Sequence, residues 1–261
     1  MADGVVERLH VLPCEEEFCR LKEGGRVSFL RVDYLKDLLG ELGVNGELLK
    51  VVKSANKAKV DEAKCVGCGN CVHYCPYEAA SLRSPGIASI DEEKCMGCGI
   101  CLAHCPNFAI TLEGYEHESL NETLAKLAEK ARVGGKPIAV FYCQWAYTPK
   151  PSEGDGSNIC FIELPCAGRV DPLHIVQALN MGFEAVLVLA CKHELCNFEE
   201  AGAKRAEENL KILKKLLDQL GLGEKVEIAF VSPKYPGEAD QALSNFVGKI
   251  GGGRENDCCK A

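Results

Sequence analysis

The chain has 261 residues, of which 47% are hydrophobic and 26% are charged, an ordinary balance for a soluble globular protein of one or two domains. Its formal net charge of −8 argues against a nucleic acid as partner. The longest apolar run, at 185–191, is too short to span a bilayer, and MADGVVERLH lacks the apolar region of a signal peptide. We therefore expect a cytoplasmic protein, because 17 cysteines with metal-binding spacing indicate a reducing compartment rather than disulfides.

Residues 1–57 form an N-terminal extension ahead of the first cysteine motif. VSFLRVDYL at 27–35 predicts a short strand that leads into a helix, with Asp33 as the N-cap and leucines along one face. A second helix is expected over Glu47–Ser54.

Residues 58–113 contain an internal duplication, because 58–82 and 88–112 share 13 identities in 25 positions. Each copy carries C-x-x-C-x-x-C-x-x-x-C-P, the spacing of a bacterial-type ferredoxin with two [4Fe–4S] clusters. In this spacing three closely spaced thiolates bind one cluster and the fourth binds the other. The predicted ligands are Cys65, Cys68, Cys71 and Cys105 for one cluster, and Cys95, Cys98, Cys101 and Cys75 for the second.

Each copy should fold as half of an α+β ferredoxin that needs its partner half to bury a face. Short strands are expected to start at Val60 and Ile90, and each half to close with a helical turn and a strand at 79–82 or 109–112. A zinc site is the alternative, but zinc takes four ligands in two C-x-x-C pairs, and three cysteines plus a fourth oversupply it. The rings between the ligands are expected to pack around the clusters rather than coordinate them: His73, Tyr74 and His104.

Residues 114–135 show apolar residues at helical spacing and end at Gly134-Gly135, which predicts a connecting helix. Residues 136–250 then alternate apolar strands with helices. The predicted strands cover 137–143, 159–166, 185–191 and 226–232. The predicted helices run from Asp171-Pro172 to about Met181, over about 200–220 and over about 238–248. This pattern predicts a flavodoxin- or Rossmann-like α/β domain with a parallel sheet covered on both faces, followed by a flexible tail at 251–261.

Cysteines follow three consecutive predicted strands of this domain. Cys143, Cys166 and Cys191 stand at the strand ends, and Cys196 lies in the adjoining loop. Because the carboxyl ends of parallel strands share one sheet edge, we expect these four side chains to converge. Four thiolates suit a [2Fe–2S] cluster, a [4Fe–4S] cluster or zinc, and the alternative is a set of buried structural cysteines.

These same residues carry a family resemblance. FYCQWAY at 141–147, LPCAGRVDP at 164–172 and LACKHELCNF at 189–198 resemble the delta, or iron–sulfur, subunit of methyl-viologen-reducing (F420-non-reducing) hydrogenase. The resemblance covers about 136–250 and implies a [2Fe–2S] cluster held by Cys143, Cys166, Cys191 and Cys196.

The family pattern has further cysteines around Trp145, where this chain has Tyr142 and Ala146. Arg169 matches the family's C-x-G-R, and the resemblance implies support of the cluster or of a partner contact. Because the simplest family members lack the ferredoxin, the chain resembles a fusion of ferredoxin and delta subunit.

The predicted function is electron transfer within a multi-subunit oxidoreductase. The resemblance implies docking on a flavoprotein like the A subunit of heterodisulfide reductase, of the kind that bifurcates electrons, with a catalytic partner at the other end. That partner would be a hydrogenase, formate dehydrogenase, aldehyde oxidoreductase or acyl-CoA reductase. The sequence shows no G-x-G-x-x-G after a strand, no G-x-x-x-x-G-K-[ST] and no H-E-x-x-H, so we expect no catalytic residues of its own.

Two other hypotheses remain open. Residues 136–250 could form a thiol or zinc module, which would make the chain a redox sensor or scaffold. The chain could also be a self-contained reductase that binds a substrate at the sheet edge. The remaining cysteines are predicted to be unligated, with an additional cluster as the alternative for the first pair: Cys14 and Cys19, the strand residue Cys160, and the vicinal Cys258 and Cys259.

Overall fold

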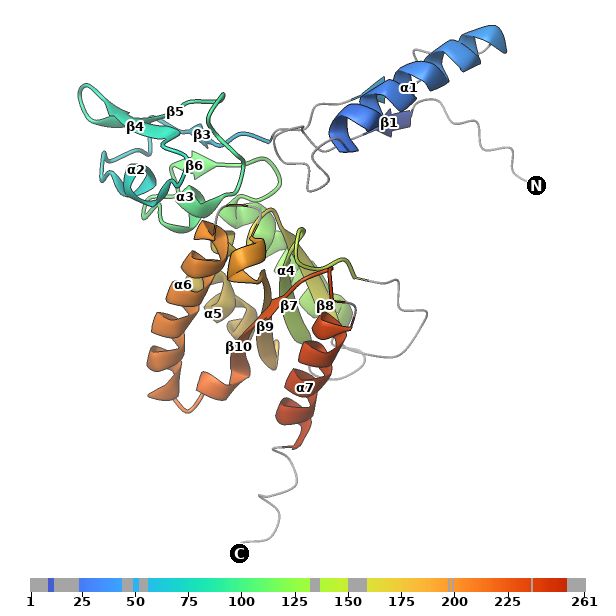
Figure 1. Cartoon of the computed structure of the whole chain (residues 1–261). Helices are drawn as coiled ribbons and strands as arrows, with labels where there is room; N and C mark the ends of the chain where they lie inside the picture. Colours follow the sequence, from blue (N-terminus) through green and yellow to red (C-terminus); the bar gives the residue numbers. More distant parts are fainter. Residues whose placement is uncertain are drawn as a thin grey trace, which may run out of the picture. The chain divides into compact units, whose positions relative to one another are not determined.

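The computed structural model describes residues 9–11, 24–43, 49–51, 56–131, 137–149, 159–196, 198, 200–235 and 237–252 (Figure 1). Its contacts divide the chain into two compact units, residues 1–56 and residues 57–261. The second unit contains both the duplicated cysteine motif and the α/β domain. Among the described residues, no helix combines the length and the hydropathy that a membrane-spanning segment needs.

The first unit pairs two short parallel strands beside one helix. Strand β1 (Leu9–Val11) pairs with β2 (Leu49–Val51), and α1 (Gly24–Glu41) lies between them in the sequence. The strand predicted at 27–35 is therefore wrong, and Asp33 lies inside a helix. The helical spacing of the leucines extends N-terminally to Val32, which is buried. The apolar face of the helix therefore begins before the predicted N-cap.

The helix predicted over Glu47–Ser54 is also wrong, because β2 occupies its described part, Leu49–Val51. The strand is stabilised by pairing with β1, a partner nearly 40 residues away in the sequence, with Leu9 opposite Leu49. A local sequence pattern cannot reveal a pairing partner so far away. The residues around Glu47–Ser54 alone therefore indicated only a helix.

The ferredoxin module at the start of the second unit is built from two interleaved halves. Its elements are β3 (Lys59–Val60), α2 (Asn70–Tyr74), β4 (Ala80–Arg83), β5 (Ile87–Ile90), α3 (Ile100–Ala103) and β6 (Ile110–Thr111). The first strand pairs antiparallel with the last, and β4 pairs antiparallel with β5. Val60 and Ile90 therefore each end a strand rather than starting one. Strand β3 begins one residue earlier, and β5 begins directly after the tight connection from β4.

The α/β domain is a four-stranded, fully parallel sheet with the order β10-β9-β7-β8. Its strands are β7 (Ile138–Cys143), β8 (Ile159–Leu164), β9 (Ala185–Cys191) and β10 (Val226–Val231), which confirms the predicted parallel sheet. Its helices are α4 (His117–Ala131), α5 (Pro172–Asn180), α6 (Ala201–Asp218) and α7 (Glu238–Gly252). The chain runs outwards from β7 to β8 and returns across β7 to β9, so β7 and β9 flank the switch point where such sheets place ligands.

Hydrophobic residues cover both faces of this sheet. Leu124 of α4 and Ile175 of α5 are fully buried against one face, together with Phe141 of β7. Phe246 of α7 is buried against the other, beside Leu187 of β9. The two central strands, β7 and β9, are buried along their whole length, which is the pattern of a parallel sheet covered on two sides.

Short caps and one-turn helices bring the chain to the carboxyl edge of the sheet. The Asp171 carboxylate accepts a hydrogen bond from the Leu173 amide at 2.8 Å, and Pro172 occupies the first helical position, as predicted for the start of α5. The 3₁₀ turn η3 (Ala167–Arg169) follows β8, and η4 (His193–Leu195) follows β9. Cys166 is the N-cap of η3 and Cys196 is the C-cap of η4, so these turns set the positions of the two cysteines outside the strands.

Candidate metal centres

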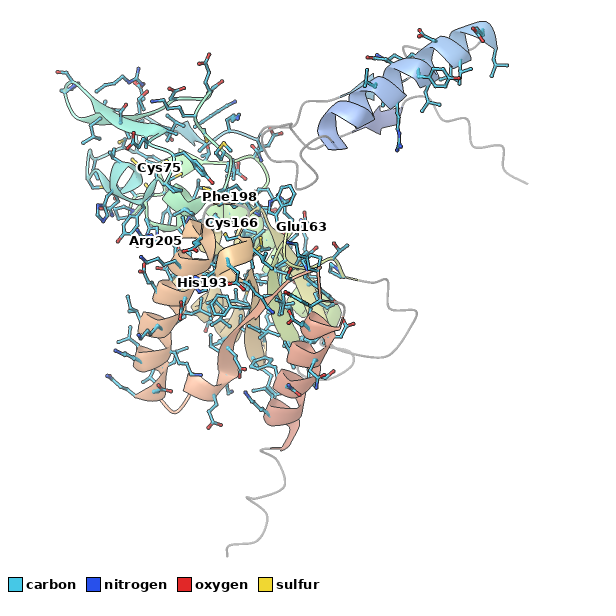
Figure 2. The ribbon with its side chains drawn as sticks, viewed as in Figure 1. Cys75, Glu163, Cys166, His193, Phe198 and Arg205 are labelled. Carbon is cyan, nitrogen blue, oxygen red and sulfur yellow. The ribbon has the colours of Figure 1, made fainter. Side chains whose placement is uncertain are left out.

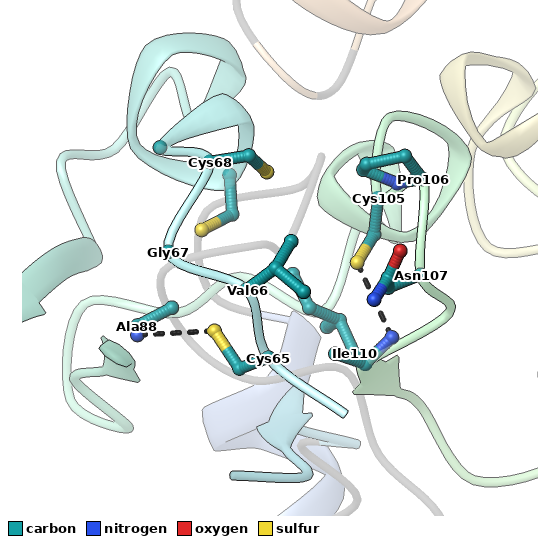
Figure 3. Close-up of a pocket in the computed structure, with 12 residues that line it drawn as sticks. Cys65, Val66, Gly67, Cys68, Ala88, Cys105, Pro106, Asn107 and Ile110 are labelled. Atoms are coloured by element: carbon teal, nitrogen blue, oxygen red, sulfur yellow. Dashed lines mark hydrogen bonds between the residues drawn. The ribbon is translucent and has the colours of Figure 1, made fainter. Parts of the chain in front are cut away.

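Two cavities of the ferredoxin module are each lined by four cysteines. The first is lined by Cys65, Cys68, Cys71 and Cys105, which we name the first group (Figure 3). The Ala88 amide donates to the Cys65 sulfur at 3.4 Å, and the Ala109 amide donates to the Cys105 sulfur at 3.2 Å. Cys68 is exposed, so this group reaches the molecular surface.

The second cavity is lined by the other four motif cysteines, which we name the second group: Cys75, Cys95, Cys98 and Cys101. Here the Ala58 amide donates to the Cys95 sulfur at 3.5 Å, as Ala88 does at the duplicated position. Three of these cysteines are buried, whereas the first group has one buried cysteine. Burial raises the pKa of the Cys98 and Cys101 thiols, with further contributions from neighbouring cysteines.

The donor sets fit iron–sulfur clusters in chemistry and in shape. Each cavity offers four thiols with amide hydrogens directed at sulfur, as at Cys65 and Cys95. Gly67 has a positive φ of 68°, and a Cβ there would overlap the Gly86 carbonyl oxygen, so the loop requires glycine. Thiols that burial keeps protonated become ligands when a cationic metal centre compensates the thiolate charge.

The rings between the motif cysteines pack on one another. Tyr74 and His104 stack with centroids 3.7 Å apart, and His73 meets the Tyr74 edge at 4.9 Å. The Arg205 guanidinium of α6 lies over Tyr74 at 4.8 Å, so this stack also joins the ferredoxin to the α/β domain. Figure 2 shows Arg205 on the end of α6 that faces the ferredoxin.

The structure brings Cys143, Cys166, Cys191 and Cys196 together at the carboxyl edge of the sheet, and we name them the third group. The sulfurs of Cys143 and Cys191, on the two strands that flank the switch point, are 3.7 Å apart. Hydrogen bonds link Cys143 to Cys166 and Cys191 to Cys196. Two ligands about 2.3 Å from one tetrahedral ion lie roughly 3.8 Å apart, so the first separation suits a shared metal ion.

The start of α6 closes over the third group. A Cβ on Gly202 would overlap the Cys166 sulfur and would lie 3.5 Å from the Cys196 sulfur, so only glycine leaves room for both. The Gly168 amide donates to the Cys166 sulfur at 3.4 Å, and amides of Phe198 and Ala203 donate to Cys196.

The third group also needs a positive charge before it can ionise. The hydrogen bond with Cys166, partly offset by that with Cys191, raises the pKa of Cys143 to about 12. The bond with Cys143 lowers the pKa of Cys166, but burial together with the neighbouring Cys98 and Cys196 leaves that pKa above its ordinary value. The bond with Cys191, followed by burial, raises the pKa of Cys196. Three thiols that resist ionisation, beside the Cys191 sulfur at 3.7 Å from that of Cys143, suit a cationic metal centre.

Other cysteines are placed apart from these groups or lie outside the described residues. Cys160 is buried in β8 within the hydrophobic core, as predicted for a strand interior, and burial raises its pKa. Cys14, Cys19, Cys258 and Cys259 lie outside the described residues.

A buried polar cluster that the sequence did not predict lies between the ferredoxin and the α/β domain. His117 and His174 stack with centroids 4.7 Å apart and planes 25° apart, and His117 Nε2 lies 3.7 Å from a carboxylate oxygen of Asp171. Stacked imidazoles have nearly parallel lone pairs that do not converge on one ion, and the Arg169 cation is close enough to lower both histidine pKa values. We interpret the pair as packed neutral rings. The Asp171 cap was visible in the sequence, but no pattern links residues 117 and 174.

Arg169 is the largest fully buried side chain among the described residues. Its Nε and Nη2 donate to the Tyr115 carbonyl oxygen at 3.2 and 2.8 Å. Its Nη1 has no hydrogen-bond partner among the described residues. Burial lowers the pKa of this guanidinium to about 10, opposed by Asp171 and by Cys101 of the second group.

Comparison with known proteins agrees with both modules. Residues 58–112 match the family model described as 4Fe-4S dicluster domain, and residues 138–252 match that of methyl-viologen-reducing hydrogenase, delta subunit. Fold and cysteine groups together define an iron–sulfur protein in which a ferredoxin-type module is joined to a parallel α/β domain.

Two relatives fix the family. The chain is 39% identical over 121 residues to the iron–sulfur D subunit of F420-non-reducing hydrogenase from Archaeoglobus profundus, covering 43% of this chain and 87% of the relative. It is 30% identical over 116 residues to the iron–sulfur D subunit of the vhu F420-non-reducing hydrogenase from Methanocaldococcus jannaschii, covering 41% and 84%. The chain therefore belongs to the family of hydrogenase delta, or iron–sulfur D, subunits, and it is an iron–sulfur electron-transfer subunit.

A second kind of relative spans more of the chain. The chain is 35% identical over 216 residues to the A subunit of the ferredoxin/F420H2-dependent CoB-CoM heterodisulfide reductase from Methanosarcina acetivorans, which covers 77% of this chain but 27% of that protein. This span is longer than either module, so the similarity includes parts of both. The predicted resemblance to a ferredoxin joined to a delta subunit is confirmed.

Proposed function

We propose that the chain conducts electrons through three iron–sulfur clusters, between a flavoprotein like the A subunit of heterodisulfide reductase and a catalytic oxidoreductase subunit. The first and second groups would each ligate one [4Fe–4S] cluster. The third group, Cys143, Cys166, Cys191 and Cys196, would ligate a [2Fe–2S] cluster. The chain would contribute the conducting path, and the partners would supply substrate chemistry, including any electron bifurcation.

The observation that carries this proposal is the linear order of the three groups. Cys71 of the first group interacts electrostatically with Cys101 of the second, and Cys98 of the second interacts with Cys166 of the third. Such an order supports stepwise transfer from the exposed Cys68 end to the sheet edge.

Contacts between the two modules support a fixed rather than a diffusible ferredoxin. Tyr77 of the ferredoxin meets Phe198 of the β9–α6 connection edge to face, with centroids 6.4 Å apart. Phe108 packs on His117 of α4 at 4.2 Å. Figure 2 shows Phe198 and Cys166 at the end of the α/β domain next to the ferredoxin. These contacts would hold the second and third groups at a constant separation.

The partner proposal rests on the relatives. The delta-subunit relatives are named as hydrogenase subunits, and the longer similarity is to a protein named as the A subunit of a heterodisulfide reductase. A polypeptide that contains parts of both modules within a heterodisulfide reductase supports a partner of that kind for the separate chain.

The test is anaerobic purification with metal analysis, EPR and identification of copurifying subunits. Two cubanes and one binuclear cluster predict about 10 irons per chain, and an additional cubane predicts about 14. Cys166→Ala should remove about two irons and the signal of the third cluster, whereas the buried control Cys160→Ala should retain both.

Zinc in place of iron in the third group is the outcome that would favour a sensor or scaffold, since the 3.7 Å sulfur separation also suits zinc. Turnover of a substrate by the isolated chain with an artificial donor would favour a self-contained reductase.

A further inference from the structure

The two halves of the ferredoxin are duplicated in sequence but differ in the charges around them. An offset of 30 residues relates Gly69 to Gly99, and Lys57 to Ile87. The backbone is matched at both sites, because Gly69 and Gly99 each precede a short helix with the same φ of 77°. The two cluster environments can therefore differ in their burial and in the side chains that pack around them.

Two such differences distinguish the second group from the first. A Cβ on Gly99 would lie 3.0 Å from the Arg169 side chain, whereas one on Gly69 would lie 3.7 Å from Leu82. The Lys57 ammonium donates to the Cys95 carbonyl oxygen at 2.7 Å, and the duplicated position holds Ile87. The second group thus has two cations where the first group has apolar side chains.

Arg169 occupies an unusual electrostatic position. It is 0% exposed, and none of the described carboxylates lies within ion-pair distance of its guanidinium. Its hydrogen-bond acceptor is a neutral carbonyl, that of Tyr115. A buried cation without a paired anion is costly unless another negative charge compensates it. Asp171 is the strongest of the negative groups that interact with it, and Cys101, a ligand in the proposed second cluster, is the next. Cys166 lies three residues before Arg169 in the chain.

We propose that Arg169, assisted by Lys57, raises the reduction potential of the cluster held by the second group, and so makes two duplicated clusters unequal. The inference rests on the proposed function, since it requires clusters in both cavities. Reduction adds one electron and one negative charge without breaking a bond. A buried guanidinium stabilises that added charge directly, whereas desolvation of the same cluster opposes it.

The two cations would influence the direction of electron transfer along the three clusters. The second group is more buried than the first, so burial alone would make its cluster the harder one to reduce. Arg169 and Lys57 offset that penalty at the second cluster, which lies between the exposed first cluster and the third group. Arg169 would act on the clusters electrostatically, through space, and not on a substrate.

The experiment is an EPR-monitored redox titration of the full, cluster-containing chain with dithionite as reductant. Arg169→Gln should lower the reduction equilibrium constant of one cubane at least tenfold, which is about 59 mV for one electron, and leave the other unchanged. Arg169→Lys keeps the charge and should retain most of the potential. Lys57→Gln, at a half-exposed position, should shift the same cubane roughly threefold because solvent screens its charge.

Two further variants assign the signals. Arg83→Gln removes an exposed arginine from the ferredoxin surface and should shift neither cubane beyond error. Leu82→Arg, at the half-exposed position beside Gly69, should raise the potential of the cubane that Arg169→Gln leaves unchanged.

The inference is overturned by an iron-replete Arg169→Gln chain that shifts neither cubane or shifts both equally. It is also overturned if Arg169→Lys shifts the potential as much as Arg169→Gln, because the two donated bonds to Tyr115 would then be what matters. If Arg169→Gln fails to assemble clusters, Lys57→Gln and Leu82→Arg decide the question. A chain without iron would instead refute the proposed function.

Discussion

The ferredoxin groups and the third group are built in opposite ways. The eight ferredoxin cysteines lie within 41 residues, from Cys65 to Cys105, and short loops set their positions. The four cysteines of the third group span 54 residues, from Cys143 to Cys196, and three of them lie at the ends of different strands. The first arrangement depends on local turns, and the second depends on the sheet.

The difference has an energetic consequence. A ligand group made by loops can form whenever those loops can close, and its clusters in turn stabilise them. A group assembled from strand ends exists only when β7 and β9 are paired and α6 covers them. The third centre should therefore be lost first when the chain is perturbed, and damage to the sheet should not reach the ferredoxin clusters.

The sharpest way to break this comparison is Gly202→Ala. The new methyl group would occupy the space of the Cys166 sulfur, and the backbone of α6 cannot move away without disturbing Cys196. We expect the third centre to be lost and the cubane EPR signals to remain, with iron per chain falling by about two. The measurement is iron analysis together with EPR.

Gly248→Ala is the matched control for that substitution. Gly248 also lies in a helix, α7, and a Cβ there would meet nothing within 4 Å. Full iron content in both variants would show that the third centre does not use the space beside Gly202.

A substitution in the sheet core comes next in size. Leu187 of β9 is fully buried, and Leu187→Ala should reduce the free energy of unfolding by about 2–5 kcal/mol through lost burial and the cavity that remains. The exposed control Leu216→Ala should change it by less than about 0.5 kcal/mol. Thermal unfolding followed by circular dichroism and by cluster absorbance should show the third centre bleaching before the cubanes. Simultaneous bleaching would contradict independent assembly.

The same contrast explains what the sequence could reveal. The ferredoxin cysteines are grouped by spacing alone, and the two cavities are lined by the same sets of four. The strand ends could be located because the strands are mostly apolar runs, unbroken in the two central strands, as in AVLVLAC before Cys196. The convergence of the four cysteines could then be predicted, because the carboxyl ends of parallel strands always lie at one edge of the sheet.

What the sequence could not reveal depends on contacts between distant segments. Strand β2 is defined by pairing with β1, and its few residues favour no state alone. The histidine stack joins His117 of α4 to His174 of α5, and Arg169 reaches back to the Tyr115 carbonyl oxygen. Each of these contacts requires segments far apart in the chain to be packed together, which no local window contains.

The junction between the two regions gives a prediction of intermediate size. Burial, with help from Arg169 and His117, lowers the pKa of His174 to about 3. The unfolded chain therefore binds more protons than the folded chain between pH 6.5 and 3, and stability is lost as pH falls through this window. Between pH 7 and 5.5 this loss should be about 1 kcal/mol.

Chemical unfolding of the wild-type chain and His174→Gln at both pH values is the measurement. The variant should be less stable at pH 7 but should lose about 1 kcal/mol less on acidification. Equal pH dependence in the two chains would show that His174 ionises without cost, and hence that the junction is open to water.

The smallest effects are expected at surface ion pairs, and one lies in each region. Lys249 of α7 contacts both carboxylate oxygens of Glu227 at 2.8 and 3.1 Å, and Arg83 of the ferredoxin lies 3.3 Å from Glu62. Both cations are more than half exposed, so solvent and salt screen the attraction whatever the geometry. Lys249→Ala and Arg83→Ala should each change the free energy of unfolding by less than about 0.5 kcal/mol, and less still in high salt. A loss above about 1 kcal/mol at Lys249 alone would mean that the pair fixes α7 against the sheet, and that the sheet edge depends on surface contacts as well as on its core.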